Sequence, residues 1–108
     1  MKGCLLRFYM HENRKHGHIL LYEWLLEHAK QIGIHGGSAF RAIAGFGRHG
    51  RIHEQHFFEL AGDLTVQVDF FVSDEDADRL IDLFRRENIH VVFARLEAEI
   101  GVINGDEK

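Results

Sequence analysis

The feature that most constrains the fold is a strict alternation of apolar and polar side chains between residues 64 and 72. Its apolar positions are Leu64, Val66, Val68, Phe70 and Val72. Because successive side chains of a strand point to opposite faces of a sheet, this pattern predicts a β-strand with one buried face. Ser73 follows at once and residues 74–76 are all acidic, which is typical of an N-cap and a first helical turn. The sequence therefore predicts a strand that passes directly into a helix.

The first half of the chain predicts a strand, a helix and a second strand. Alternating side chains predict the first strand over residues 4–11, and the polar stretch 12–17 predicts a turn. A helix follows, because apolar side chains recur at helical spacing and Gly33 is placed to cap its end. Its apolar stripe consists of Leu21, Trp24, Leu25, His28, Ala29 and Ile32. Residues 38–45 predict the second strand, and the segment from Gly50 to about Leu60 predicts a loop.

The second half completes a recognisable order of elements. The helix after Ser73 has an apolar stripe that includes Leu80 and Phe84, and a fourth strand is predicted over residues 92–100. The order strand, helix, strand, strand, helix, strand is the split βαβ pattern. We therefore expect an α+β fold of the ferredoxin-like βαββαβ type, an antiparallel sheet with two helices on one face.

The other face of this sheet is expected to meet a partner subunit. The alternation leaves open whether that face carries Arg7 and Tyr9 or Phe93 and Arg95. In either case the face is half apolar, and such faces are often covered by another copy of the chain. The sequence thus predicts a homo-oligomer.

Length and charge limit the remaining possibilities. The 108 residues predict a single domain over 1–108, with about 102–108 as a flexible tail. The longest apolar runs are a few residues, so we expect no membrane-embedded segment. One cysteine favours a reducing, cytoplasmic compartment. A net charge of −4 argues against nucleic-acid binding, whereas residues 38–53 contain arginines and no acid, which suits a small anion.

The basic stretch contains a glycine-rich bend. Two close glycines, Gly45 and Gly47, let the backbone turn sharply, and its N–H groups can then form a concave anion site. Arg48 and Arg51 add guanidinium donors. The alternative on residue types alone is a hairpin loop whose arginines simply face water.

The segment Gly45-Phe46-Gly47-Arg48 resembles the G-F-G-R segment with which PII signalling proteins enter their T-loop. The order and spacing of the elements are similar from about Leu5 to Ile100, and the similarity is greatest to the short, uncharacterised PII-like proteins of bacteria and archaea. The resemblance implies a homotrimer with effector pockets in the clefts between subunits, where PII proteins bind adenine nucleotides. It also implies that a T-loop-like segment reports occupancy to a partner, such as a membrane transporter or an enzyme.

The same resemblance implies a set of ligand-binding residues. They are Gly45, Phe46, Gly47, Arg48, His49 and Arg51. His49 stands where PII proteins place a glutamine that helps to hold magnesium and 2-oxoglutarate, so sensing of 2-oxoglutarate is not expected. The loop after Gly50 is shorter than a PII T-loop and has no tyrosine for uridylylation. Residues 86–90 replace the Gly-rich phosphate-binding loop of PII proteins, which favours AMP or ADP over ATP as the effector.

The histidines raise an alternative function. The chain has nine, and His49, His53 and His56 are close in sequence. Neutral imidazoles suit zinc, copper or nickel, so a trimeric divalent-metal-binding protein is the second hypothesis. A closed site wants about four ligands, which argues against a metal and favours the nucleotide. A small enzyme is the third, but no spacing of acid, base or nucleophile marks a catalytic site, and we expect a non-enzymatic protein.

Overall fold

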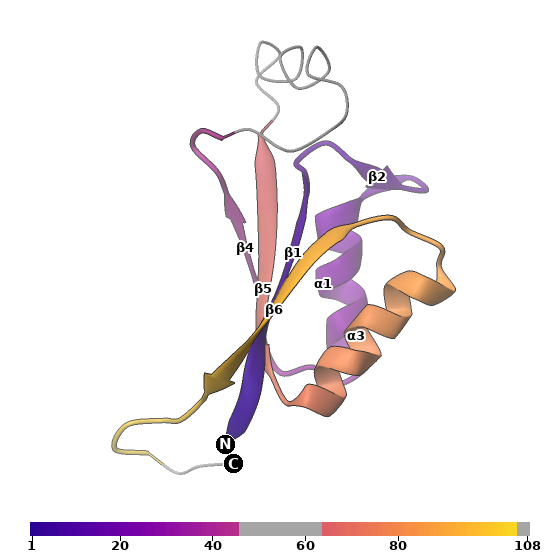
Figure 1. Ribbon diagram of the computed structural model, residues 1–108. Coiled ribbons are helices and arrows are strands. Elements are labelled where there is room, and N and C mark those ends of the chain that lie inside the picture. The colour runs from indigo at the N-terminus through magenta and orange to yellow at the C-terminus, as the bar shows by residue number, and fades with distance from the viewer. Residues whose placement is uncertain (46–63, 106–108) are drawn as a thin grey trace.

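The structure is a computed structural model that describes residues 1–45 and 64–105. Its main sheet is antiparallel, with four strands in the order β4-β5-β1-β6. These strands are β1 (Lys2–His11), β4 (Ser38–Arg41), β5 (Thr65–Val72) and β6 (Val92–Glu99). The helices α1 (Leu21–Gln31) and α3 (Asp74–Arg86) lie together on one face of the sheet (Figure 1). The predicted ferredoxin-like α+β fold is confirmed.

The core lies between the sheet and the two helices. In β1 and β5, alternate side chains are fully buried, as the alternation predicted. The ring of Phe8 in β1 packs 4.7 Å from the ring of Phe84 in α3 and meets Phe70 of β5 edge-on at 6.2 Å. Burial of one such ring contributes about 1.5–3 kcal/mol. The layer is closed on the helix side by Leu21, Leu25, Leu80 and Ala77.

The start of α3 matches the sequence prediction in atomic detail. Ser73 is the N-cap, and its Oγ accepts a hydrogen bond from the backbone N–H of Asp76 at 3.1 Å. The carboxylates of the first turn lie at the positive end of the helix dipole, and Arg85 and Arg86 lie in the last turn. This end of α3 is therefore fixed by local sequence.

The end of α1 is also as predicted, with an additional tie from the other helix. Gly33 follows the C-cap with φ +94°, a conformation that glycine adopts without strain. The guanidinium of Arg79 in α3 donates to the carbonyl oxygen of Ile32 at 2.6 Å. The two helices are thereby joined at this end.

Two short strands replace part of the predicted turn over residues 12–17. β2 (Lys15–His16) pairs with β3 (Ile19–Leu20) in a small hairpin that turns at Gly17, where φ is +67°. The prediction was wrong here because strands of two residues are too short to show an alternating pattern. The hairpin leads straight into α1.

β4 ends at Arg41 and not at residue 45. The backbone N–H of Ala42 still donates to the carbonyl oxygen of Thr65 at 2.8 Å, after which the chain leaves the sheet. Residues 42–45 are alanine, isoleucine and glycine, of which alanine and glycine are poor strand formers. The predicted flexible tail stays a prediction, because residues 106–108 lie outside the described part.

The register decides which side chains lie on the open face of the sheet. Arg7 of β1 is opposite Asp69 of β5 and Ala94 of β6, whereas Phe93 is opposite the buried Phe8. Directly opposed residues share a face. Arg7 and Tyr9 therefore lie on the open face, and Phe93 and Arg95 lie on the helix face.

Candidate functional site

The predicted ligand-binding segment begins where β4 leaves the sheet. Gly45 is described, is exposed, and has no atom of the described chain within 4 Å of a Cβ added to it. The other predicted ligand-binding residues, Phe46, Gly47, Arg48, His49 and Arg51, lie outside the described residues, as do the predicted loop and the cluster of His53 and His56. Of the candidate site, the structure therefore describes Gly45 and the bordering end of β4 and start of β5. Together with Glu12, these strand ends are called the base of the site below.

That base is organised around Glu12, the first residue after β1. Its backbone N–H donates to the carbonyl oxygen of Leu64 at 2.9 Å, and the Leu64 N–H donates back to Oε2 at 3.2 Å. On the other side, Arg41 at the end of β4 donates from Nε to Oε1 at 2.5 Å and from Nη2 to Oε2 at 3.3 Å. One residue thus contacts both ends of the connection between β4 and β5.

The electrostatics of this base follow from those contacts. The hydrogen bonds from Arg41 and then from the backbone of Leu64 hold the pKa of Glu12 below its ordinary value, and the same pair raises the pKa of Arg41. Nearby in the chain, partial burial lowers the pKa of Arg14. Arg41 and Glu12 thus form a matched pair at this end of the sheet, and Arg14 follows Glu12 by two residues in the chain. The net charge of these three side chains is positive, which suits an anionic ligand better than a cation.

Glu12 was missed as a site residue by the sequence analysis. It was assigned to a polar turn, and its partners Arg41 and Leu64 are 29 and 52 residues away. A local pattern could not reveal it. Only the sheet order brings the three residues together.

The centre of the open sheet face carries a polar cluster. Arg7 donates from Nε and Nη2 to the two carboxylate oxygens of Asp69 at 2.8 and 3.1 Å, and the Asp69 side chain is only 13% exposed. With its amide oxygen turned toward Arg7, Gln67 accepts from Nε at 3.2 Å. The contacts with Asp69 and Tyr9 raise the pKa of Arg7. Because it is bidentate and its carboxylate is largely buried, this pair is stronger than an ordinary surface ion pair.

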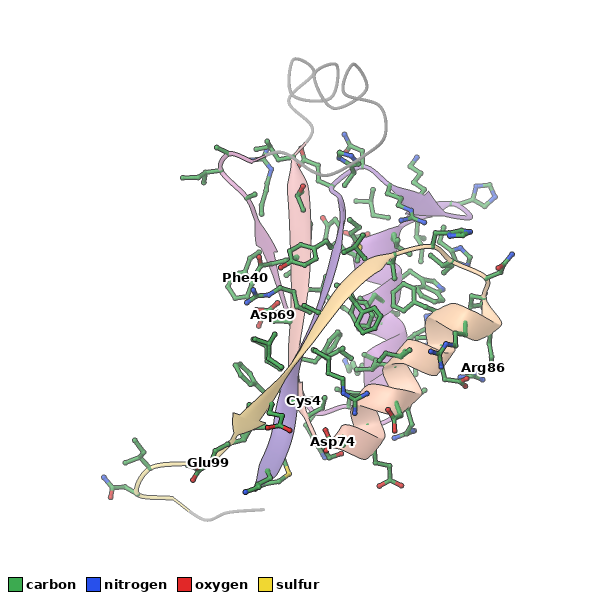
Figure 2. The ribbon with its side chains drawn as sticks, in the orientation of Figure 1. Cys4, Phe40, Asp69, Asp74, Arg86 and Glu99 are labelled. Atoms are coloured by element: carbon green, nitrogen blue, oxygen red, sulfur yellow. The ribbon has the colours of Figure 1, made fainter. Side chains whose placement is uncertain are left out.

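Exposed apolar side chains surround that cluster. Phe71, Val92 and Leu96 lie on the same face by register, and all three are large and exposed. Phe40 and Asp69 lie on the side of the sheet away from the helices (Figure 2). An apolar patch with a central, hydrogen-bonded charge pair has the composition of a subunit interface.

A groove of about 610 Å³ runs between α3 and β6 on the helix side. Two of its arginines are already paired: Arg95 donates to Asp78 at 2.7 Å and to the carbonyl oxygen of Asp74 at 3.1 Å, and Arg79 donates to Asp76 at 3.1 Å. The exposed ring of Phe93 forms part of its wall. With acids and arginines alternating along it, this groove has no charge preference and is not the candidate site.

Metal and cysteine chemistry find no support within residues 1–45 and 64–105. No three His, Cys, Asp or Glu side chains of these residues gather to hold a metal ion. Cys4 is buried, and burial raises the pKa of its thiol, so that it remains protonated as a small core side chain. In the same ranges, no helix has the length and apolar character needed to cross a membrane.

An antiparallel β4-β5-β1-β6 sheet with two helices on one face defines the ferredoxin-like class of α+β proteins. A solved structure from Thermus thermophilus, described as a PII-like signaling protein, matches with a TM-score of 0.53 and 18% sequence identity, over 90% of this chain and 89% of that chain. The chain itself belongs to the family described as DUF190, Uncharacterized ACR, COG1993, which matches residues 3–96. The expected relation to an uncharacterised PII-like branch is confirmed.

Two relatives show how far this family extends. A UPF0166 protein of Aquifex aeolicus (strain VF5) is 31% identical over 101 residues, which cover 86% of this chain and 96% of the relative. A UPF0166 protein of Methanocaldococcus jannaschii is 27% identical over 81 residues, which cover 75% of this chain and 74% of the relative. Bacterial and archaeal proteins thus share this domain over most of their length.

Proposed function

We propose that the chain is a cytoplasmic, non-enzymatic sensor that forms a homotrimer and binds an adenine nucleotide in the clefts between subunits. AMP or ADP is favoured over ATP. Occupancy is passed through the short T-loop-like segment to a partner protein, such as a membrane transporter or an enzyme. The ligand-binding residues are Gly45, Phe46, Gly47, Arg48, His49 and Arg51.

The observation that supports this proposal is the place of Gly45, the first residue of the glycine-arginine segment and the only one that the structure describes. β4 ends at Arg41, and Gly45 follows within four residues at the same end of the sheet as Leu64. In a PII-like fold, the G-F-G-R segment therefore starts just beyond an edge strand. Backbone N–H groups in a glycine bend, with an adjacent guanidinium, are well suited to a phosphate group.

The proposed trimer is supported by the open sheet face. Its exposed apolar side chains and its central Arg7–Asp69 pair are the features expected of a surface covered by other copies. Assembly through this face would leave α1 and α3 on the outside. It would also bring the edges of neighbouring sheets together, which is where clefts between subunits form.

The connection between α3 and β6 supports a nucleotide with few phosphates. Three of its backbone donors are used to end the helix: the N–H groups of Glu87, Asn88 and Ile89 donate to carbonyl oxygens of α3. Those N–H groups are consequently not available to a triphosphate. The segment also contains no glycine, so that a close approach of the backbone to a ligand is restricted.

Calorimetry with AMP, ADP, ATP and Zn²⁺ tests the proposal directly. We expect stoichiometric binding of AMP or ADP to the wild-type protein and weaker binding of ATP. Arg48→Ala should reduce AMP affinity by about ten- to a hundredfold, because charge-assisted hydrogen bonds contribute about 1.5–3 kcal/mol, and should leave the melting temperature unchanged. Lys30→Ala, which removes an exposed cation of α1, is the control and should bind normally.

The outcomes separate the two hypotheses. Unchanged affinity in the Arg48→Ala variant would place the nucleotide elsewhere. If no adenine nucleotide binds while Zn²⁺ does so stoichiometrically, the protein is a metal-binding trimer that uses the histidines His49, His53 and His56.

A further inference from the structure

The two strands that border the connection between β4 and β5 are held in place in different ways. β4 is an edge strand of four residues, and all four are exposed. Its neighbour β5, in contrast, buries every second side chain in the core. Side-chain packing therefore fixes β5 firmly and β4 weakly. Something other than burial must fix the point at which the chain leaves β4.

Glu12 is placed to do so, because it follows the most firmly fixed strand of the sheet. β1 lies between β5 and β6 and its alternate side chains are fully buried. Glu12 continues the ladder past β1 through the hydrogen bond from its N–H to the carbonyl oxygen of Leu64. Its backbone is consequently held independently of its side chain.

The Glu12 carboxylate contacts both the end of β4 and the residue that precedes β5. Oε1 and Oε2 accept from the guanidinium of Arg41, and Oε2 also accepts from the N–H of Leu64. The Glu12 side chain is 20% exposed and that of Arg41 is 56% exposed. The carboxylate is thus the sheltered, fixed partner, and Arg41 is the partner that it orients.

We propose that Glu12 is a positioning residue of the effector site, which holds Arg41 and the start of β5 together and so sets the direction in which the chain leaves β4 toward Gly45. This rests on the proposed function, because it assigns the ligand to the segment that begins at Gly45. Glu12 itself does not contact the ligand. We call the contacts of Glu12 with Arg41 and Leu64 the clamp. Glu12 acts through the backbone of Ala42, which follows Arg41 and whose N–H donates to the carbonyl oxygen of Thr65.

The test replaces the carboxylate by an amide of the same size. Glu12→Gln keeps an acceptor for the Leu64 N–H but loses the charge pair with Arg41. We expect AMP affinity to fall by about three- to thirtyfold, the range of energetic coupling between linked sites. Hydrogen exchange at the amides of Ala42 and Leu64 should become faster, whereas exchange in the core of β1 should not change.

The matched control is Asp82→Asn, which removes a carboxylate from an exposed ion pair with Arg86 on α3. It should change neither AMP affinity nor exchange at Ala42 and Leu64. Arg41→Gln breaks the same pair from the other side. It should reproduce the Glu12→Gln result and serves in its place if that variant does not fold.

The results distinguish this inference from the proposed function. If the wild-type protein binds AMP and Glu12→Gln binds it equally well, the positioning role is wrong and the proposed function stands. Faster exchange with unchanged affinity also contradicts the positioning role, because the clamp would then be structural. If the wild-type protein binds no nucleotide, the proposed function fails and the role of Glu12 in an effector site fails with it.

Discussion

At the scale of single residues, Gly37 shows how closely the helix-side core approaches the backbone. A Cβ at this position would lie 2.4 Å from Cε1 and 2.8 Å from Cδ1 of Phe70, whose ring is buried in the core. The ring cannot move away without displacing its neighbours. Packing against the ring of Phe70, and not the backbone conformation, is therefore the reason why this position needs a glycine.

Gly37→Ala should accordingly destabilise the protein by about 1–3 kcal/mol, the cost of overpacking a well-filled core. Gly36→Ala is the matched control, because no atom of the described chain lies within 4 Å of its added Cβ. It should change the stability by less than about 0.5 kcal/mol. Urea denaturation of both variants measures the difference. Equal stabilities would show that Phe70 can move aside.

At the scale of elements, the parts that could be predicted are those whose signal is local. The alternation of β5 and the capping side chain at Ser73 lie within a few residues of one another, and both were predicted correctly. The hairpin of β2 and β3 was not predicted, because it is held by pairing over two residues on each strand. Glu12 was missed for a related reason: its partners are close only because β4 and β1 flank β5.

The cap of α3 provides a prediction at this scale. Ser73→Ala removes the acceptor for the Asp76 N–H and should cost about 1 kcal/mol of unfolding free energy. Ser38→Ala, at an exposed position of β4, is the control and should cost a few tenths at most. Chemical denaturation compares the two. A loss in the Ser73 variant no larger than in the control would mean that the acidic first turn alone fixes the start of the helix.

At the scale of the whole molecule, the two faces of the sheet differ in what covers them and in what they contribute. One face is closed by the helices and supplies the stability of the subunit through buried side chains such as Phe8 and Leu80. The other exposes Phe71 and Leu96 around a hydrogen-bonded ion pair. Because that pair is satisfied within the subunit, it can be covered by a partner without leaving a charge unpaired. The open face is therefore suited to assembly.

Phe71→Glu tests whether this face holds the proposed trimer together. The side chain is 63% exposed and lies opposite Leu5 on the open face, so the substitution should leave the subunit folded. A carboxylate buried without a partner in an interface would cost several kcal/mol per subunit, which is enough to convert a trimer to monomers at micromolar concentration. Ile103→Glu is the control, because Ile103 is 90% exposed and follows the last strand of the sheet. Light scattering should report monomers for the first variant and trimers for the second. A trimer that persists in Phe71→Glu would place the subunit contacts at the sheet edges, and a wild-type monomer at all concentrations would remove the intersubunit cleft.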